Sequence, residues 1–339
     1  MAQHQAAFLD GVNKPLRVGP IDTKKPGPTE VFIKVAAVAI NPVDWKIQQY
    51  GAFVTKWPTI VGEDIAGEII EVGEQVTRFS KGQRVITHST AFLNQSADKA
   101  GFQEYVLNIQ EAVALLPDSI SYEAGVVLPL SVSTASAGLF QSSHLALDKP
   151  STTPKKNGKK LLVWGASSSV GTSAVQLAVA AGYDVIATAS EKNFGLVKSL
   201  GATAVFDHRS PTIVADLVAE LKKGEFVGAY DAISLRETQL AIAQVEQELG
   251  GGFIATVLPA IEDAPAKVTI KGTLALSIFK EHAEVGKAVW EDFLPQALKS
   301  GQFKPSPPPK VVGKGLEILQ SAFDEQKAGV SAAKIVVTL

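Results

Sequence analysis

From residue 161 onward, segments typical of strands and of helices alternate along the chain, and this alternation limits the fold more than any other feature of the 339 residues. The expected strands cover 161–164, 184–188, 204–206, 226–233 and 252–257, and the expected helices cover 170–181, 192–200, 212–223 and 235–249. The strands are near-continuous apolar runs, as in sheets that are buried on both faces. The pattern therefore predicts an α/β fold with a parallel, doubly wound sheet.

The first 125 residues predict a different, β-rich unit. Short strand-like runs at 31–40, 65–72 and 84–86 are separated by turn residues, which is typical of a compact, partly barrel-like domain. Residues 121–145 favour helix, and 148–160 form an exposed loop. The last 55 residues contain an amphipathic helix near 285–299, a proline-rich turn, another helix and a closing strand at 334–339. They have no core of their own, so we expect them to return to the N-terminal unit.

Composition removes several classes of function. The chain has no cysteine, which excludes cysteine nucleophiles, disulfides and every Cys-ligated metal site. The formal net charge of −2 offers no field that attracts nucleic acid. The sequence shows no signal peptide and no apolar run of membrane-spanning length, which predicts a soluble, cytoplasmic protein of about two domains.

A glycine-rich turn, residues 165–171, lies directly between an expected strand and an expected helix. Small residues there let the backbone approach a pyrophosphate, and the first turn of the helix offers free N–H groups. The expected contacts to a dinucleotide come from Gly165, Ser167, Ser168, Ser169 and Val170. The alternative is an ordinary tight strand–helix turn.

The residues that follow the second expected strand of the alternating region decide between NADH and NADPH. Ser190, Lys192 and Asn193 stand where a 2′-phosphate would bind, with serine as a hydrogen-bond donor and lysine as a point charge. Glu191 opposes this interpretation, because a carboxylate there can bind a free ribose 2′-hydroxyl. We favour NADPH. Leu258 and Pro259 follow a later strand and are expected near the nicotinamide edge.

Three further segments, 39–46, 61–73 and 128–135, together with the turn and the ending 329–339, resemble the medium-chain dehydrogenase/reductase superfamily. The string from Asn41 to Lys46 is similar to the zinc-free quinone oxidoreductase and enoyl reductase branch. The long loop before residue 161 and the region of Ser190 look most like fungal trans-acting enoyl reductases that serve polyketide synthases.

The resemblance implies a GroES-like catalytic domain, split over residues 1–126 and 275–339, around a Rossmann domain at 127–274. Zinc-dependent members carry cysteine and histidine ligands. Here Asn41 and the run Gly62–Glu63–Asp64 stand at those positions, so we expect no metal.

Without a Lewis acid, reduction of an activated C=C bond is easier than oxidation of an alcohol, because the substrate carbonyl receives the electrons as an enolate. The sequence therefore predicts an NADPH-dependent reductase of enoyl thioesters or enones. Two alternatives stay open: an NADPH:quinone oxidoreductase, and an NADPH-binding interaction protein with little turnover.

Four residues are candidates for catalysis. Lys46 is expected to stabilise the enolate or the nicotinamide ribose, and Asp44 to orient Lys46 or cap a short helix. Tyr50 is either a proton donor or a core aromatic residue, and Thr134 either contacts the nicotinamide or packs within a helix. Asn41 either binds the cofactor or shapes a turn.

The expected partners are a small-molecule substrate and, from the resemblance, an acyl-carrier or polyketide synthase partner. We expect no nucleic acid and no membrane. The chain is a monomer or a homodimer, because the strand candidate 268–271 either pairs with its copy or remains a capped edge.

Overall fold

The computed structural model describes residues 2–339, which fold into two compact units. The β-rich unit holds the chain up to residue 130 together with 298–301 and 305–339. The parallel-sheet unit holds residues 131–297 and 302–304. Both units carry an extensive apolar core, as expected for a chain of this length.

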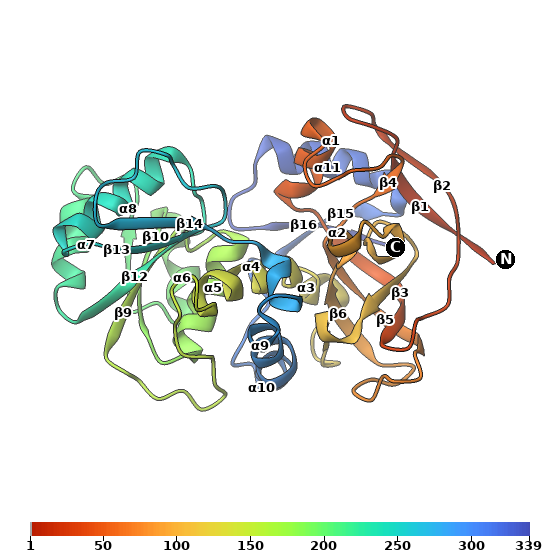
Figure 1. Cartoon of the computed structure of the whole chain (residues 1–339), viewed down its shortest axis with the longest axis horizontal. Coiled ribbons are helices and arrows are strands. Elements are labelled where there is room, and N and C mark those ends of the chain that lie inside the picture. The colour runs from red at the N-terminus through yellow and green to blue at the C-terminus, as the bar shows by residue number, and fades with distance from the viewer. Residues whose placement is uncertain (1) are drawn as a thin grey trace. The chain divides into compact units, whose positions relative to one another are not determined.

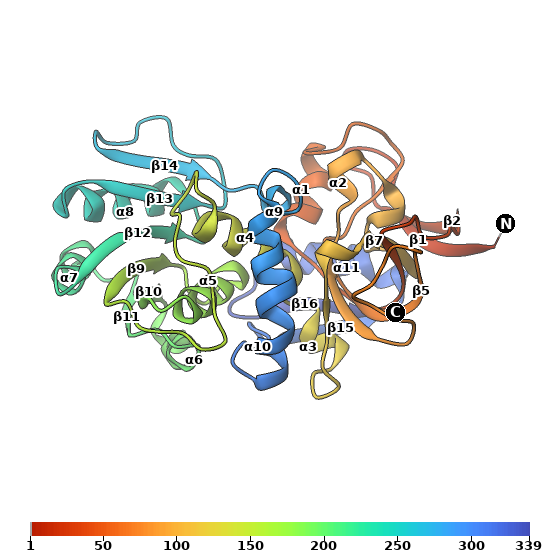
Figure 2. The same cartoon turned by 60° about the horizontal axis from the view of Figure 1, so that its bottom comes forward.

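The parallel-sheet unit is built on six strands in the order β11-β10-β9-β12-β13-β14, and Figure 2 shows them in this order. All neighbouring pairs are parallel. The strands are β9 (Lys159–Trp164), β10 (Asp184–Ala189), β11 (Ala204–Asp207), β12 (Glu225–Asp231), β13 (Gly252–Thr256) and β14 (Val268–Gly272). This confirms the predicted doubly wound sheet, in which the strand order reverses beside β9.

Helices near the predicted positions connect successive strands: α5 (Ser169–Ala180), α6 (Phe194–Ser199), α7 (Ile213–Leu221) and α8 (Arg236–Glu248). Helix α4 (Pro129–Phe140) precedes β9, and α9 (Ala283–Gly286) and α10 (Leu294–Ser300) follow β14. Leu217 and Leu221 of α7 and Ile242 of α8 pack on Leu162 and Ile254 of the sheet. Residues 148–158 form the expected exposed loop.

The β-rich unit contains two sheets, and Figure 1 labels strands of both. The smaller has the order β2-β1-β4, from β1 (Gln3–Leu9), β2 (Leu16–Asp22) and β4 (Thr59–Ile60). The larger has the order β15-β16-β3-β5-β6-β8, with β7 also paired to β3. Its strands are β3 (Glu30–Ala39), β5 (Asp64–Val72), β6 (Arg84–His88), β7 (Tyr105–Ile109), β8 (Val113–Leu115), β15 (Pro309–Lys314) and β16 (Lys334–Thr338).

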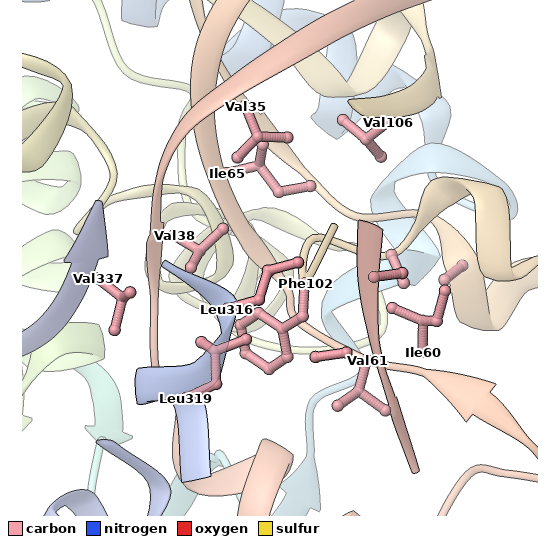
Figure 3. Packing of buried hydrophobic residues seen from close by; sticks show 14 of the residues in the cluster. Val35, Val38, Ile60, Val61, Ile65, Phe102, Val106, Leu316, Leu319 and Val337 are labelled. Carbon is pink, nitrogen blue, oxygen red and sulfur yellow. The ribbon is translucent and has the colours of Figure 1, made fainter. Parts of the chain in front are cut away.

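The closing strand β16 pairs antiparallel with β3, with Val337 opposite Val38. The expected return of the C-terminal segment to the N-terminal unit is therefore confirmed. Figure 3 shows Val38 and Val337 in one apolar cluster with Ile65, Phe102 and Leu319. The helices of this unit are α1 (Pro42–Tyr50), α2 (Ala91–Asn94), α3 (Tyr122–Gly125) and α11 (Leu319–Ala328).

The division into units differs from the sequence division at residues 275–297. The sequence placed this segment with the β-rich unit, whereas in the structure it belongs to the parallel-sheet unit. The reason is its packing: Trp290 is fully buried, donates from Nε1 to Ser133 Oγ at 3.1 Å and meets the Phe279 ring edge-on. The chain thus returns to the β-rich unit later than position 275.

One helical stretch, Tyr122–Phe140, is long and apolar enough to cross a membrane by length and composition. It is 83% buried inside the protein, as a core helix is. The stretch is also not one continuous helix, since α3 ends at Gly125 and α4 begins at Pro129.

Candidate functional site

The glycine-rich turn joins the end of β9 to the start of α5, and its two glycines are required by close packing. Gly165 has φ +75°, and a Cβ atom there would lie 2.4 Å from Ile233. A Cβ atom at Gly171 would lie 2.3 Å from the Gly165 carbonyl oxygen. Ser168 stands where a third glycine is usual, and its Oγ accepts from the Gly171 N–H at 3.1 Å as the N-cap of α5.

Backbone bonds fix this turn against the end of β10. The Gly165 N–H donates to Thr188 Oγ1 at 3.1 Å, and the Ala166 N–H donates to the Thr188 carbonyl at 2.9 Å. Asn193 Nδ2 reaches back to Ser167 Oγ at 3.3 Å. The predicted residues Gly165, Ser167 and Asn193 are thereby brought together.

The turn also fits a phosphate-bearing ligand. Ser169 Oγ is buried and has no hydrogen-bond partner among the described residues. Val170 follows it in the first turn of α5, where backbone N–H groups and the helix dipole favour an anion. A pyrophosphate would satisfy both groups, so the residues present fit the dinucleotide that the predicted fold implies.

The region after β10 carries charged side chains of both signs. Ser190 is half-buried, whereas Glu191 and Lys192 are exposed. Asp207, at the end of β11, lies opposite Ala189 in the sheet register. Its carboxylate binds the Arg209 guanidinium at 2.8 and 3.0 Å, and these bonds lower the pKa of Asp207 to about 2.

Arg209 is a candidate that the sequence analysis missed. The signal was present, because Arg209 follows a predicted strand, and the carboxyl ends of parallel strands meet at one edge of the sheet. Its side chain is 61% exposed, so it is accessible to a ligand at that edge.

Asp231, at the end of β12, is a second polar residue at a strand end that the sequence did not single out. It is fully buried and accepts from the Ser234 N–H at 2.9 Å and from Thr238 Oγ1 at 2.6 Å. Burial raises the pKa of Asp231, and these bonds oppose that rise. Asp231 thereby shapes the turn that follows β12.

The remaining predicted residues of this unit are Leu258, Pro259 and Thr134. Leu258 and Pro259 follow β13: the Leu258 carbonyl accepts from Thr256 Oγ1 at 2.7 Å, and Pro259 is exposed. Thr134 lies in α4, and its carbonyl accepts from the Tyr230 hydroxyl at 2.9 Å. That bond uses the backbone carbonyl of Thr134 and not its side chain.

The β-rich unit contains a cluster of buried polar side chains, which we call the buried polar cluster: Asn41, Asp44, Glu63, Asp64, His88 and Lys334. Lys334 Nζ lies 2.8 Å from Asp64 Oδ2 and also donates to Asn41 Oδ1. Asn41 Nδ2 donates to Asp64 Oδ2 at 2.8 Å. Both polar atoms of the Asn41 side chain are therefore used inside this unit.

The protonation of the cluster is set by burial. Burial first, and the charge of neighbouring carboxylates second, raise the pKa of Asp44 and Glu63 well above its ordinary value. Burial lowers the pKa of His88 to about 4. Glu63 Oε2 and His88 Nε2 lie 3.4 Å apart, an ion-pair distance, but both pKa shifts favour the neutral partners. We therefore read this contact as neutral acid against neutral imidazole.

The donor set of the cluster does not fit zinc. Within residues 2–339, no group of three or more His, Cys, Asp or Glu side chains is arranged to hold a metal ion. The resemblance puts the ligand positions at Asn41, Glu63 and Asp64. The Lys334 ammonium already binds two of these side chains, and a second cation beside it would be repelled.

Helix α1 (Pro42–Tyr50) carries three of the four predicted catalytic residues, Asp44, Lys46 and Tyr50. Asp44 Oδ2 accepts from the Asn41 N–H at 2.7 Å, so Asp44 caps the helix from inside. Lys46 is half-buried with its ammonium over the Trp45 ring, at 5.7 Å from the centroid. Tyr50 is 65% exposed, which excludes the alternative of a core aromatic residue.

Known proteins match both units. The family described as "Alcohol dehydrogenase GroES-like domain" matches residues 27–118, and the family "Zinc-binding dehydrogenase" matches residues 169–250. "Trans-enoyl reductase himH" of Aspergillus japonicus is 42% identical over 96% of this chain and 94% of its own length. "Dehydrogenase orsE" of Emericella nidulans is 40% identical over the full length of both chains.

Solved structures agree on the fold. An alcohol dehydrogenase superfamily protein from Novosphingobium aromaticivorans has a TM-score of 0.80 at 23% identity, covering 99% of both chains. CurK enoyl reductase has a TM-score of 0.75 at 22% identity, also covering 99% of both chains. Together with the matches in sequence, these show that the chain is an oxidoreductase of the medium-chain dehydrogenase/reductase superfamily, whose fold binds a nicotinamide cofactor, and that it belongs among the relatives of fungal trans-enoyl reductases.

Proposed function

We propose that the protein is an NADPH-dependent reductase that transfers hydride to the activated C=C bond of an enoyl thioester or enone without zinc. The observation that carries this proposal is Lys334, whose ammonium binds side chains at two expected metal-ligand positions. A reductase of conjugated carbonyls needs no metal to lower the pKa of an alcohol. The relatives named trans-enoyl reductases support the same substrate class.

The cofactor, when bound, supplies the hydride to the β-carbon of the substrate. The chain has to hold the pyrophosphate, for which the proposed residues are Gly165, Ser168, Ser169 and Val170. The 2′-phosphate is assigned to Ser190 and Lys192, with Asn193 ordering the neighbouring turn through Ser167, and Arg209 adds a second cation at this edge of the sheet. Leu258 and Pro259 stay proposed contacts of the nicotinamide edge.

On the β-rich unit, the proposed catalytic group is the Lys46 ammonium, which stabilises the negative charge that develops on the carbonyl oxygen. Asp44 orients α1 and hence Lys46, through its bond to the Asn41 N–H. Tyr50 is the proposed proton donor to the α-carbon, since its hydroxyl belongs to an exposed side chain. Thr134 stays a proposed nicotinamide contact.

The proposed partner is an acyl-carrier domain of a polyketide synthase, in the cytoplasm. The decisive experiment compares the rate of NADPH oxidation with one enoyl group on a carrier domain, the same group on a small thiol, and free quinones. We expect turnover with enoyl thioesters and fastest turnover on the carrier. Turnover with quinones alone would assign a quinone oxidoreductase, and NADPH binding without turnover would assign the interaction protein.

Cofactor choice is tested by Lys192→Ala and Arg209→Ala. Each substitution removes a cation, so we expect the Kd for NADPH to rise about tenfold per variant, with the Kd for NADH unchanged. Lys198→Ala, an exposed lysine in the last turn of α6, is the matched control. Equal effects on both cofactors would contradict the assignment of the 2′-phosphate.

The role of Lys46 is tested by Lys46→Met, which keeps the length of the side chain and removes its charge. We expect kcat to fall about a hundredfold, with the Kd for NADPH within about twofold of the parent, because the charge acts on the substrate oxygen. Lys56→Met changes an exposed lysine outside α1 and serves as the control. An unchanged kcat would remove Lys46 from the mechanism.

A further inference from the structure

The buried side chain of Gln239 joins two segments of the parallel-sheet unit. Gln239 lies in the first turn of α8 and is 1% exposed. Its Nε2 donates to the carbonyls of Ser234 at 3.0 Å and Pro259 at 3.1 Å. Its Oε1 accepts from the Ile261 N–H at 3.0 Å. One side chain thus ties the turn after β12 to the segment after β13.

The partners of Gln239 match the chemistry of a primary amide. They are two carbonyl oxygens and one N–H group, so the side chain at this position has to supply two donors and one acceptor. Glutamine supplies both donors from Nε2 and the acceptor from Oε1, whereas a glutamate carboxylate offers no donor and leucine offers neither. Replacement by leucine would remove all three bonds, and backbone groups that lose a partner inside a protein cost free energy.

The turn after β12 is itself fixed, so it can serve as an anchor. Asp231 accepts from the N–H groups of Ile233 and Ser234 at 3.0 and 2.9 Å. Ser234 adopts φ +59°, which is uncommon for a residue other than glycine and has to be maintained by its surroundings. Its Oγ donates to the Asp231 carbonyl and accepts from the Val257 N–H, both at 2.8 Å. Ser234 is therefore a second tie between the two segments.

The segment held in this way follows the carboxyl end of β13, and ligands of open α/β sheets bind beyond the carboxyl ends of the strands. It contains Leu258 and Pro259, the proposed contacts of the nicotinamide edge. The Val257 carbonyl and the Leu258 N–H have no hydrogen-bond partner among the described residues, whereas the Val257 N–H and the Leu258 carbonyl are bonded within the unit. A free acceptor next to a free donor matches a carboxamide, which carries one group of each kind.

We propose that Gln239 is a positioning residue for the nicotinamide half of the cofactor. It holds residues 257–261 so that the Val257 carbonyl and the Leu258 N–H meet the nicotinamide carboxamide, and it does not touch the ligand itself. No covalent step is involved. The inference rests on one part of the proposed function, the assignment of Leu258 to the nicotinamide edge. It does not depend on the choice between NADPH and NADH or on the substrate that is reduced.

The test is isothermal titration of the full chain with NADPH and with 2′-phospho-ADP-ribose, which has the same phosphates and riboses but no nicotinamide. For Gln239→Leu we expect the Kd for NADPH to rise about tenfold, because the carboxamide contacts are lost. The Kd for 2′-phospho-ADP-ribose should stay within about twofold of the parent, because its contacts lie elsewhere. Gln244→Leu, at an exposed glutamine of the same helix, is the matched control and should change neither Kd.

Hydrogen exchange of the ligand-free chain gives a second readout that does not depend on binding. The segment 257–261 should exchange faster in Gln239→Leu than in the parent, while β13 should exchange at the parent's rate. Ser234→Gly removes the second tie and accepts φ +59° without strain, so it serves as the test if Gln239→Leu does not fold. We expect the same split between the two ligands, with a rise of about threefold in the Kd for NADPH.

A Gln239→Leu variant that binds NADPH like the parent would overturn the proposal. A variant that loses both ligands equally would also overturn it, because Gln239 would then serve only the fold. Equal Kd values of the parent for the two ligands would show that the carboxamide makes no such contact. If the parent binds NADH and not NADPH, the assignment of the 2′-phosphate fails, and the comparison of NADH with ADP-ribose decides this proposal by the same criteria.

Discussion

The glycine-rich turn and the buried polar cluster are both tightly constrained polar regions of the molecule, and they are encoded in different ways. The turn is local, because most of its hydrogen bonds are made within the residues from Gly165 to Gly171 and to one nearby partner, Thr188. The cluster brings together residues from four distant parts of the chain, from Asn41 to Lys334. A local site tolerates change elsewhere, whereas a site of dispersed residues fails when any one of them is lost.

The largest expected effect comes from removing the single cation of the cluster. Lys334→Met leaves Asp64 buried and without its counter-charge, so we expect the free energy of unfolding of the β-rich unit to fall by about 3–5 kcal/mol. Chemical denaturation followed by Trp fluorescence measures this. Lys310→Met is the control, because that exposed pair with Glu325 contributes less than about 1 kcal/mol.

The double variant Lys334→Met with Asp64→Asn should recover part of the loss, because no unpaired charge is then buried. If Lys334→Met alone lowers the free energy of unfolding by less than about 1 kcal/mol, the buried ion pair contributes no more than a surface pair does. The cluster would then be no more sensitive to the loss of one residue than the local turn.

The next effect is the pH dependence of stability that His88 gives to the buried polar cluster. The pKa of His88 is lowered from 6.5 to about 4, so between these pH values the unfolded chain binds a proton that the folded chain does not. The free energy of unfolding therefore falls as the pH falls from 6.5 to 4, by about 3 kcal/mol from this group. His88→Gln should remove this part of the profile of stability against pH.

His208→Gln, at a partly exposed histidine after β11, should leave that profile unchanged. If His88→Gln follows the parent through the whole range, His88 titrates alike in both states and its burial has no consequence for stability.

The smallest effect is expected in the local turn. Gly171→Ala places a Cβ atom 2.3 Å from the Gly165 carbonyl oxygen, which forces the turn to shift. We expect the affinity for NADPH to fall about tenfold, with a stability loss of about 1–3 kcal/mol, measured by fluorescence titration and thermal unfolding. Gly195→Ala in α6 meets open space and should do neither. Unchanged NADPH affinity for Gly171→Ala would show that the turn is less constrained than its packing indicates.

The same contrast explains how much of the molecule could be predicted from sequence. The parallel sheet and the turn were found because each strand, helix and cap is a short local pattern. Strands β1, β2, β7 and β15 were not predicted, because each is short and contains polar or glycine residues instead of a long apolar run such as 31–40. From the sequence, Lys334 was predicted only as the first residue of a closing strand, because nothing near it in the sequence indicates an ion pair with Asp64. Gln239 was missed for the same reason: it looked like one more polar residue of an expected helix.

The pairing of β16 with β3 has a consequence for how the molecule is made on the ribosome. Most of the parallel-sheet unit is one continuous stretch, 131–297, so it can fold as soon as that stretch has emerged. The β-rich unit has to wait for a strand near the other end of the printed sequence, and until then Asp64 has no Lys334 to neutralise it. The half of the protein that is synthesised first is thus the half that is finished last.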